Sequence, residues 1–130
     1  MKIVKDYHSS YLPETVYNAW ISENMVFPPI TRIEIQPKLN GNFLLYSGSG
    51  EDKGIMKGKI LEIVPHHKIR YSWHWDGSNE TTEVTVEFVK SENGSTIKLT
   101  HQGFLTKPSL ERHASGWDFY VSSLEDRLDV

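Results

Sequence analysis

The sequence predicts an α+β domain in which helices pack on one face of an antiparallel sheet. From residue 30 to residue 102 the chain is a succession of strand-like segments separated by turn residues, and such short connections join antiparallel neighbours. The last segment changes to a helical spacing of its apolar residues. The chain has 130 residues, which is enough for one domain with its own core, so we assign residues 1–130 to a single domain.

The N-terminal segment predicts one strand followed by two short helices. Residues 2–8 are expected to form the strand. Pro13 suits the first turn of a helix, and the apolar residues around it share one helical face. These are Leu12, Val16, Ala19 and Trp20. A second short helix over residues 23–27 is expected to end at Pro28-Pro29.

Six further strands follow in the prediction. Their ranges are 30–36, 42–47, 54–64, 67–75, 81–90 and 95–102. Residues that favour turns separate them. These turns are Asn40-Gly41, Gly48-Ser49-Gly50, Pro65, Asp76-Gly77 and Asn93-Gly94. Within several strands apolar and polar residues alternate, which is typical of a sheet with one buried face.

The final segment predicts a long amphipathic helix that lies across the sheet. Its apolar stripe is Leu110, Ala114, Trp117, Val121, Leu124 and Leu128. The run "YSWHWDG" places Tyr71, Trp73 and Trp75 on one face of a strand. Three such rings bury about 450–750 Å², so they need a cover, and the final helix is available. A gap between these layers would accommodate an apolar ligand; the alternative is that the rings simply fill the interior.

Charge and composition narrow the range of partners. The chain has 14 Lys and Arg against 17 Asp and Glu, a net charge of -3, and no cysteine. No polybasic run is present, so we expect neither nucleic-acid binding nor membrane binding. The first ten residues lack the apolar stretch of a secretory signal, and we therefore expect a cytoplasmic protein.

Three longer runs resemble a known family. They are "GKILEIVPHHKIRYSW" (58–73), "TTEVTVEFVKSENGSTIKLTHQGF" (81–104) and "HASGWDFYVSSLEDRL" (113–128), with "PETVYNAW" (13–20) similar to the first helix. This order of motifs resembles the activator of heat-shock protein 90 ATPase homologue family, within the START-like (SRPBCC, helix-grip) superfamily. The resemblance implies a curved sheet of about seven strands around the C-terminal helix, enclosing a cavity that many members use for hydrophobic molecules. Phe27 stands where the family often has tryptophan, so ligand preferences do not transfer.

Histidines are the main candidates for chemistry. The chain has six, but none has a partner at a metal-ligand interval, and we expect no metal and no cofactor. No Gly-x-Ser-x-Gly elbow or other catalytic signature is present. His101 has the same strand parity as Ile97 and Leu99 and should point inward. There it could bond a ligand, act as a general base, or be a buried histidine satisfied by a carbonyl.

Three functions are compatible with these features. The first is a module that binds a hydrophobic, lipid-like or aromatic small molecule, as a monomer or homodimer. The second, implied by the resemblance, is a cochaperone-like domain that binds a chaperone, and the third is a cyclase- or hydrolase-like enzyme that uses His101. The residues predicted to line the ligand site are Trp20, Phe27, Tyr46, Met56, Trp73, Trp75, His101, Trp117 and Tyr120.

Overall fold

The computed structural model describes residues 1–48, 50 and 53–129. Its elements in chain order are β1 (Lys2–Ser9), α1 (Pro13–Trp20), β2 (Ile30–Ile35), β3 (Asn42–Ser47), β4 (Gly54–Val64), β5 (Lys68–Trp75), β6 (Thr82–Ser91), β7 (Gly94–Gln102) and α2 (Lys107–Leu128). Ser49, in the predicted turn after β3, lies outside the described residues.

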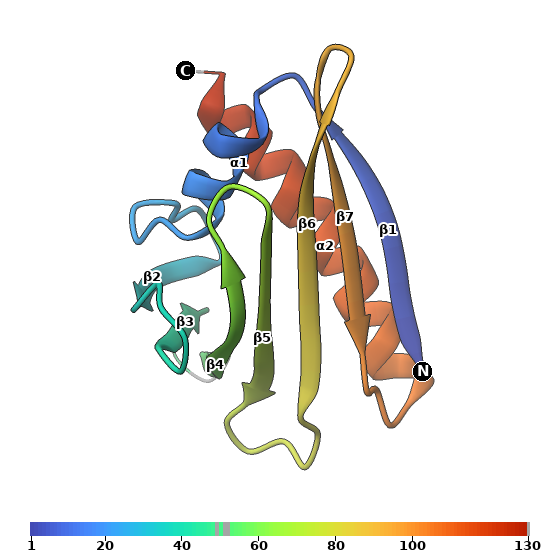
Figure 1. Cartoon of the computed structure of the whole chain (residues 1–130). Helices are drawn as coiled ribbons and strands as arrows, with labels where there is room; N and C mark the ends of the chain where they lie inside the picture. The colour runs from blue at the N-terminus through green and yellow to red at the C-terminus, as the bar shows by residue number, and fades with distance from the viewer. Residues whose placement is uncertain (49, 51–52, 130) are drawn as a thin grey trace.

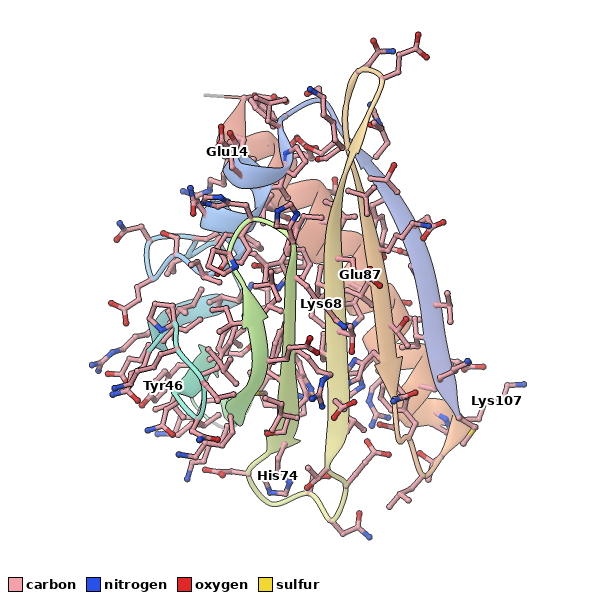
Figure 2. All side chains as sticks on the ribbon, in the orientation of Figure 1. Glu14, Tyr46, Lys68, His74, Glu87 and Lys107 are labelled. Atoms are coloured by element: carbon pink, nitrogen blue, oxygen red, sulfur yellow. The ribbon has the colours of Figure 1, made fainter. Side chains whose placement is uncertain are left out.

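The strands form one antiparallel sheet in the order β1-β7-β6-β5-β4-β3-β2. The sheet curves, and α2 runs along its concave face while α1 covers one end (Figure 1). Side chains alternate across it as predicted: Lys68 and Glu87, which pair across β5 and β6, stand on the outer face (Figure 2), whereas Tyr71 of β5 is 1% exposed on the inner face. The predicted α+β class and its helix-covered sheet are confirmed.

The predicted second short helix is wrong. Residues 21–29 form turns, in which the Met25 N–H donates to the Ser22 carbonyl and the Ile30 N–H to the Phe27 carbonyl. The Glu23 carboxylate accepts a hydrogen bond from the backbone N–H of Ile35 instead of supporting a helix. A five-residue helix gains few internal hydrogen bonds, so these competing contacts determine the conformation.

Helix α2 is fixed at its N-terminal end by side chains from a loop. Thr106 is its N-cap and accepts a hydrogen bond from the Ser109 N–H. The carboxylate of Glu80, in the loop between β5 and β6, accepts from the Ser109 hydroxyl at 2.6 Å and the Leu105 N–H at 2.7 Å. Burial would raise the pKa of Glu80, but these two hydrogen bonds, together with the charges of His113 and Arg112, outweigh it and lower the pKa.

The middle of α2 is held close to β1. Asp118 accepts hydrogen bonds from Lys5 Nζ at 2.7 Å and from the Tyr7 hydroxyl at 2.6 Å. Burial and the Asp118 carboxylate together raise the pKa of Tyr7, so this phenol stays a donor. Because α2 lies against the β1 edge of the sheet, large side chains rather than backbone fill the space between α2 and strands β2–β5.

Within the described ranges, no helix is long and apolar enough to cross a membrane.

Candidate functional site

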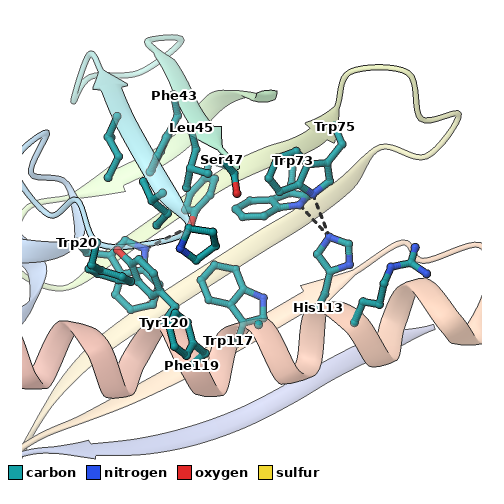
Figure 3. Close-up of a pocket in the computed structure, with 17 residues that line it drawn as sticks. Trp20, Phe43, Leu45, Ser47, Trp73, Trp75, His113, Trp117, Phe119 and Tyr120 are labelled. Carbon is teal, nitrogen blue, oxygen red and sulfur yellow. Dashed lines mark hydrogen bonds between the residues drawn. The ribbon is translucent and has the colours of Figure 1, made fainter. Parts of the chain in front are cut away.

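A cavity of about 360 Å³ lies between α2 and the half of the sheet formed by β2 to β5 (Figure 3). The sheet contributes Ile30, Ile33, Phe43, Leu45, Ser47, Tyr71, Trp73 and Trp75. The helices and the turn after α1 contribute Trp20, Phe27, Pro29, Arg112, His113, Gly116, Trp117, Phe119 and Tyr120. Nine of these seventeen residues carry a benzene or indole ring, so the wall is mainly aromatic carbon.

Two glycines on β4 allow the close approach of β5. An ideal Cβ at Gly54 would lie 3.4 Å from ring atoms of Trp75, so that ring covers the strand at this point. An ideal Cβ at Gly58 would lie 2.1 Å from the Ser72 carbonyl oxygen, so only glycine permits this approach of the two backbones. The strand that carries the rings is therefore held tightly against its neighbour.

The four tryptophans form a continuous row along the cavity. Trp20 stacks on Trp117 with ring centroids 5.7 Å apart, Trp117 lies 5.4 Å from Trp73, and Trp73 lies 5.8 Å from Trp75. Every indole N–H donates to a protein group, so the row presents mainly carbon to the cavity.

His113 anchors two of these indoles. Its Nε2 accepts hydrogen bonds from Trp73 Nε1 at 3.1 Å and Trp75 Nε1 at 3.2 Å (Figure 3). Its Nδ1 lies 2.8 Å from the Ser109 carbonyl oxygen, which can only accept, so the proton is on Nδ1. This neutral tautomer leaves Nε2 as the shared acceptor, and it ties β5 to α2 at one end of the cavity.

His101 has a structural role beneath the row of rings. Its Nδ1 accepts from Trp117 Nε1 at 3.0 Å, which leaves Nε2 to donate to Thr82 Oγ1 at 2.6 Å. The Thr82 hydroxyl in turn donates to the Trp73 carbonyl. Burial, and then the charge of nearby His113, lower the pKa of His101 to about 3. A fully buried, neutral imidazole with both nitrogens bonded cannot act as a general base toward the cavity.

Two tyrosine hydroxyls are the polar groups at the buried end of the cavity. Tyr71 accepts a hydrogen bond from Trp20 Nε1 at 3.2 Å. Tyr120 packs its ring against Trp20 with centroids 4.9 Å apart and against Trp117 at 5.7 Å. Burial raises the pKa of both phenols, and the charge that Tyr71 would carry as a phenolate raises the pKa of Tyr120 further. Both are therefore neutral at ordinary pH.

The mouth of the cavity lies between α2 and the turn after α1. Pro29, Arg112, Gly116 and Phe119 are exposed lining residues there. Phe119 is 54% exposed and its ring lies 6.3 Å from that of Phe27. Arg112 is the only lining residue with a permanent charge in the part of the chain that the structure describes. The mouth thus carries one permanent charge, and the buried end carries two neutral hydroxyls within a mainly aromatic wall.

The sequence model of the family described as Activator of Hsp90 ATPase homolog 1-like protein matches residues 10–129. The chain belongs to this family. No protein with a curated function matches it in sequence.

Solved structures of other proteins show the same START-like fold as this family member. Protein MLL2253 from Mesorhizobium loti has a TM-score of 0.86 at 18% identity, over 99% of this chain and 97% of that one. Protein CV1439 from Chromobacterium violaceum has a TM-score of 0.85 at 18% identity, over 99% and 97%. DynU16, a putative protein in the dynemicin biosynthetic locus, has a TM-score of 0.83 at 11% identity, over 99% of this chain and 47% of that one. At these identities the likeness concerns the fold alone.

Six of the nine residues predicted for the ligand site line the cavity. They are Trp20, Phe27, Trp73, Trp75, Trp117 and Tyr120. Tyr46 does not, because it alternates with the inward-facing Leu45 and bonds Glu34 on the outer face. Met56 points inward but is fully buried, with its sulfur directed toward Gly58. His101 lies behind the indoles, as described above.

Sequence reasoning missed several lining residues. His113 lies four residues before Trp117 and so on the same face of α2, a spacing that could have identified it. Phe43 and Leu45 share the inner face of β3 with Ser47, but the adjacent Leu44 leaves the alternation of this strand ambiguous in the sequence. Arg112 and Phe119 carry no such signal, because they flank the apolar stripe. No group of three metal-ligating side chains occurs among residues 1–48, 50 and 53–129.

Proposed function

We propose that this protein binds a hydrophobic small molecule, lipid-like or aromatic, in the cavity between the sheet and α2. The observation that carries the proposal is a volume of about 360 Å³ walled by aromatic rings. Pockets for small molecules range over about 300–1,000 Å³, and an apolar cavity of about 150 Å³ already takes up benzene. A ligand with two or three fused rings, or an alkyl chain of similar volume, fits this space.

The hydrogen bonding of the wall favours an apolar ligand. All four indole N–H groups are already bonded within the protein, so water in the cavity finds few partners. Displacing poorly held water by apolar groups is favourable. The row of rings is fixed at one end by His113 and at the other by Tyr71, so little ordering is required on binding.

Gly116 provides a test that separates binding from folding. An ideal Cβ at Gly116 has no other atom within 4 Å, and the residue lines the mouth. Gly116→Leu should therefore block the cavity, while leucine favours the helix over glycine. Ser115→Leu is the control, since Ser115 is exposed on the same helix and does not line the cavity.

The experiment combines native mass spectrometry of protein purified from cells with thermal shift against a panel of hydrophobic compounds. We expect the parent chain and Ser115→Leu to carry or gain a ligand at one-to-one stoichiometry, with stabilisation that grows with ligand concentration. Gly116→Leu should lose this stabilisation while its unliganded melting temperature stays equal or rises. A panel in which no compound stabilises the parent chain more than Gly116→Leu would refute the proposal.

A chaperone-binding role is the second candidate, and it rests on family membership alone. Titration of the purified chain into heat-shock protein 90, followed by calorimetry and ATPase measurement, tests it directly. An unchanged ATPase rate with no heat of binding would remove this candidate. The enzyme hypothesis that used His101 is not retained, because that imidazole is buried and bonded at both nitrogens.

A further inference from the structure

We propose that the buried end of the cavity selects ligands that carry a neutral hydrogen-bond acceptor, such as a ketone carbonyl, held by the hydroxyls of Tyr71 and Tyr120. This inference rests on the proposed binding function and specifies the ligand class. Two observations support it: the Tyr71 hydroxyl accepts one hydrogen bond but donates none to a described group, and the Tyr120 hydroxyl makes none with the described residues.

The Tyr71 hydroxyl has a proton to donate. The residue is 1% exposed, and its oxygen already accepts from Trp20 Nε1. No acceptor for its O–H is found among the described residues within hydrogen-bond distance. A buried hydroxyl that receives one hydrogen bond and donates none retains an unmet donor, and Tyr71 lines the cavity.

The Tyr120 hydroxyl makes no hydrogen bond with any group in the described part of the protein, and it too lines the cavity. Three aromatic neighbours hold its ring, since centroids of Trp20, Trp117 and Phe27 lie 4.9, 5.7 and 5.6 Å away. Burial keeps both hydroxyls protonated, and Tyr71 is near enough to raise the pKa of Tyr120 further. Two neutral O–H donors therefore face one apolar space.

An acceptor without charge matches this arrangement best. A ligand group that only donates could bond the hydroxyl oxygens, but it would leave the Tyr71 proton without an acceptor, since Tyr71 already accepts from Trp20 Nε1 and donates to no described group. A carboxylate would be desolvated far from the only permanently charged lining residue described, Arg112, which is at the mouth. A carbonyl oxygen can accept from two donors at once, and the rest of the ligand then packs against rings.

The test uses 9-fluorenone and fluorene, which share a three-ring skeleton and differ in a carbonyl against a methylene group. Isothermal calorimetry should show that the parent chain binds 9-fluorenone about 3- to 10-fold more tightly than fluorene, as expected for one or two buried hydrogen bonds. Tyr120→Phe should remove most of this preference by weakening 9-fluorenone binding, with fluorene affinity unchanged. Because the Tyr120 hydroxyl bonds no described protein group, this variant should fold as the parent does.

Two further variants complete the design. Tyr71→Phe should also reduce the preference, and Tyr46→Phe, the same change on the outer face, should leave it intact. Equal affinities for both compounds in the parent chain, or a preference that survives both Tyr120→Phe and Tyr71→Phe, would overturn this inference and leave the proposed function standing. Failure of both compounds to bind would count against the proposed function, and this inference would fail with it.

Discussion

Protonation of His101 should make folding depend on pH. Burial, followed by the charge of His113, lowers the pKa of His101 from 6.5 to about 3. Between these values the unfolded chain binds a proton that the folded chain does not, so the free energy of unfolding decreases as the pH falls below about 6.5. Each pH unit in this window costs about 1.4 kcal/mol. At pH 5 the contribution of this one residue is therefore a loss of about 2 kcal/mol.

The variant His101→Gln isolates this contribution. A glutamine amide offers one N–H donor toward Thr82 and one oxygen acceptor toward Trp117, and it does not titrate. Urea denaturation of both proteins at pH 7.5 and pH 5 should show that the parent chain loses about 2 kcal/mol more than the variant. The other five histidines are present in both proteins, and the contributions of the four that do not act on His101 cancel. Equal losses would refute the reasoning, because His101 would then titrate alike in the folded and unfolded chains.

Three more substitutions test the frame around the cavity by urea denaturation at pH 7. Gly58→Ala should destabilise the fold by about 1–3 kcal/mol, because the new Cβ would lie 2.1 Å from a backbone oxygen of β5; a change below the error of the measurement would contradict the close approach. His113→Leu should cost about 1–3 kcal/mol, since two indole N–H groups lose their acceptor, and His113→Gln should restore part of it. Asp118→Asn should cost at most about 1 kcal/mol, because its carboxylate is 57% exposed although it bonds two groups of β1.

Local patterns predicted most of the fold. The strict alternation in β5 placed Tyr71, Trp73 and Trp75 on one face, and the helical spacing of α2 brought Trp117 onto them. In contrast, β3 reads "NFLLYS", with adjacent leucines that leave its parity undecided. Alternation in this strand therefore did not exclude Tyr46 from the predicted lining, although it faces outward and bonds Glu34.

The cavity itself depends on contacts between residues far apart in the chain. Parity correctly directed His101 inward, but an inward side chain reaches the cavity only where α2 stands away from the sheet. The hydrogen bonds of Lys5 and Tyr7 to Asp118 hold α2 near β1, so the space opens over β2–β5 and His101 is covered by Trp117. No local pattern encodes that lateral position of the helix.

The row of four indoles has an optical consequence. Neighbouring ring centroids lie 5.4 to 5.8 Å apart along the whole row, so light absorbed by one tryptophan reaches the others by energy transfer, and their transitions couple in near-ultraviolet circular dichroism. A molecule entering the cavity touches this common chromophore wherever it sits. The protein thus contains its own spectroscopic reporter, and its emission will respond to occupancy without any attached dye.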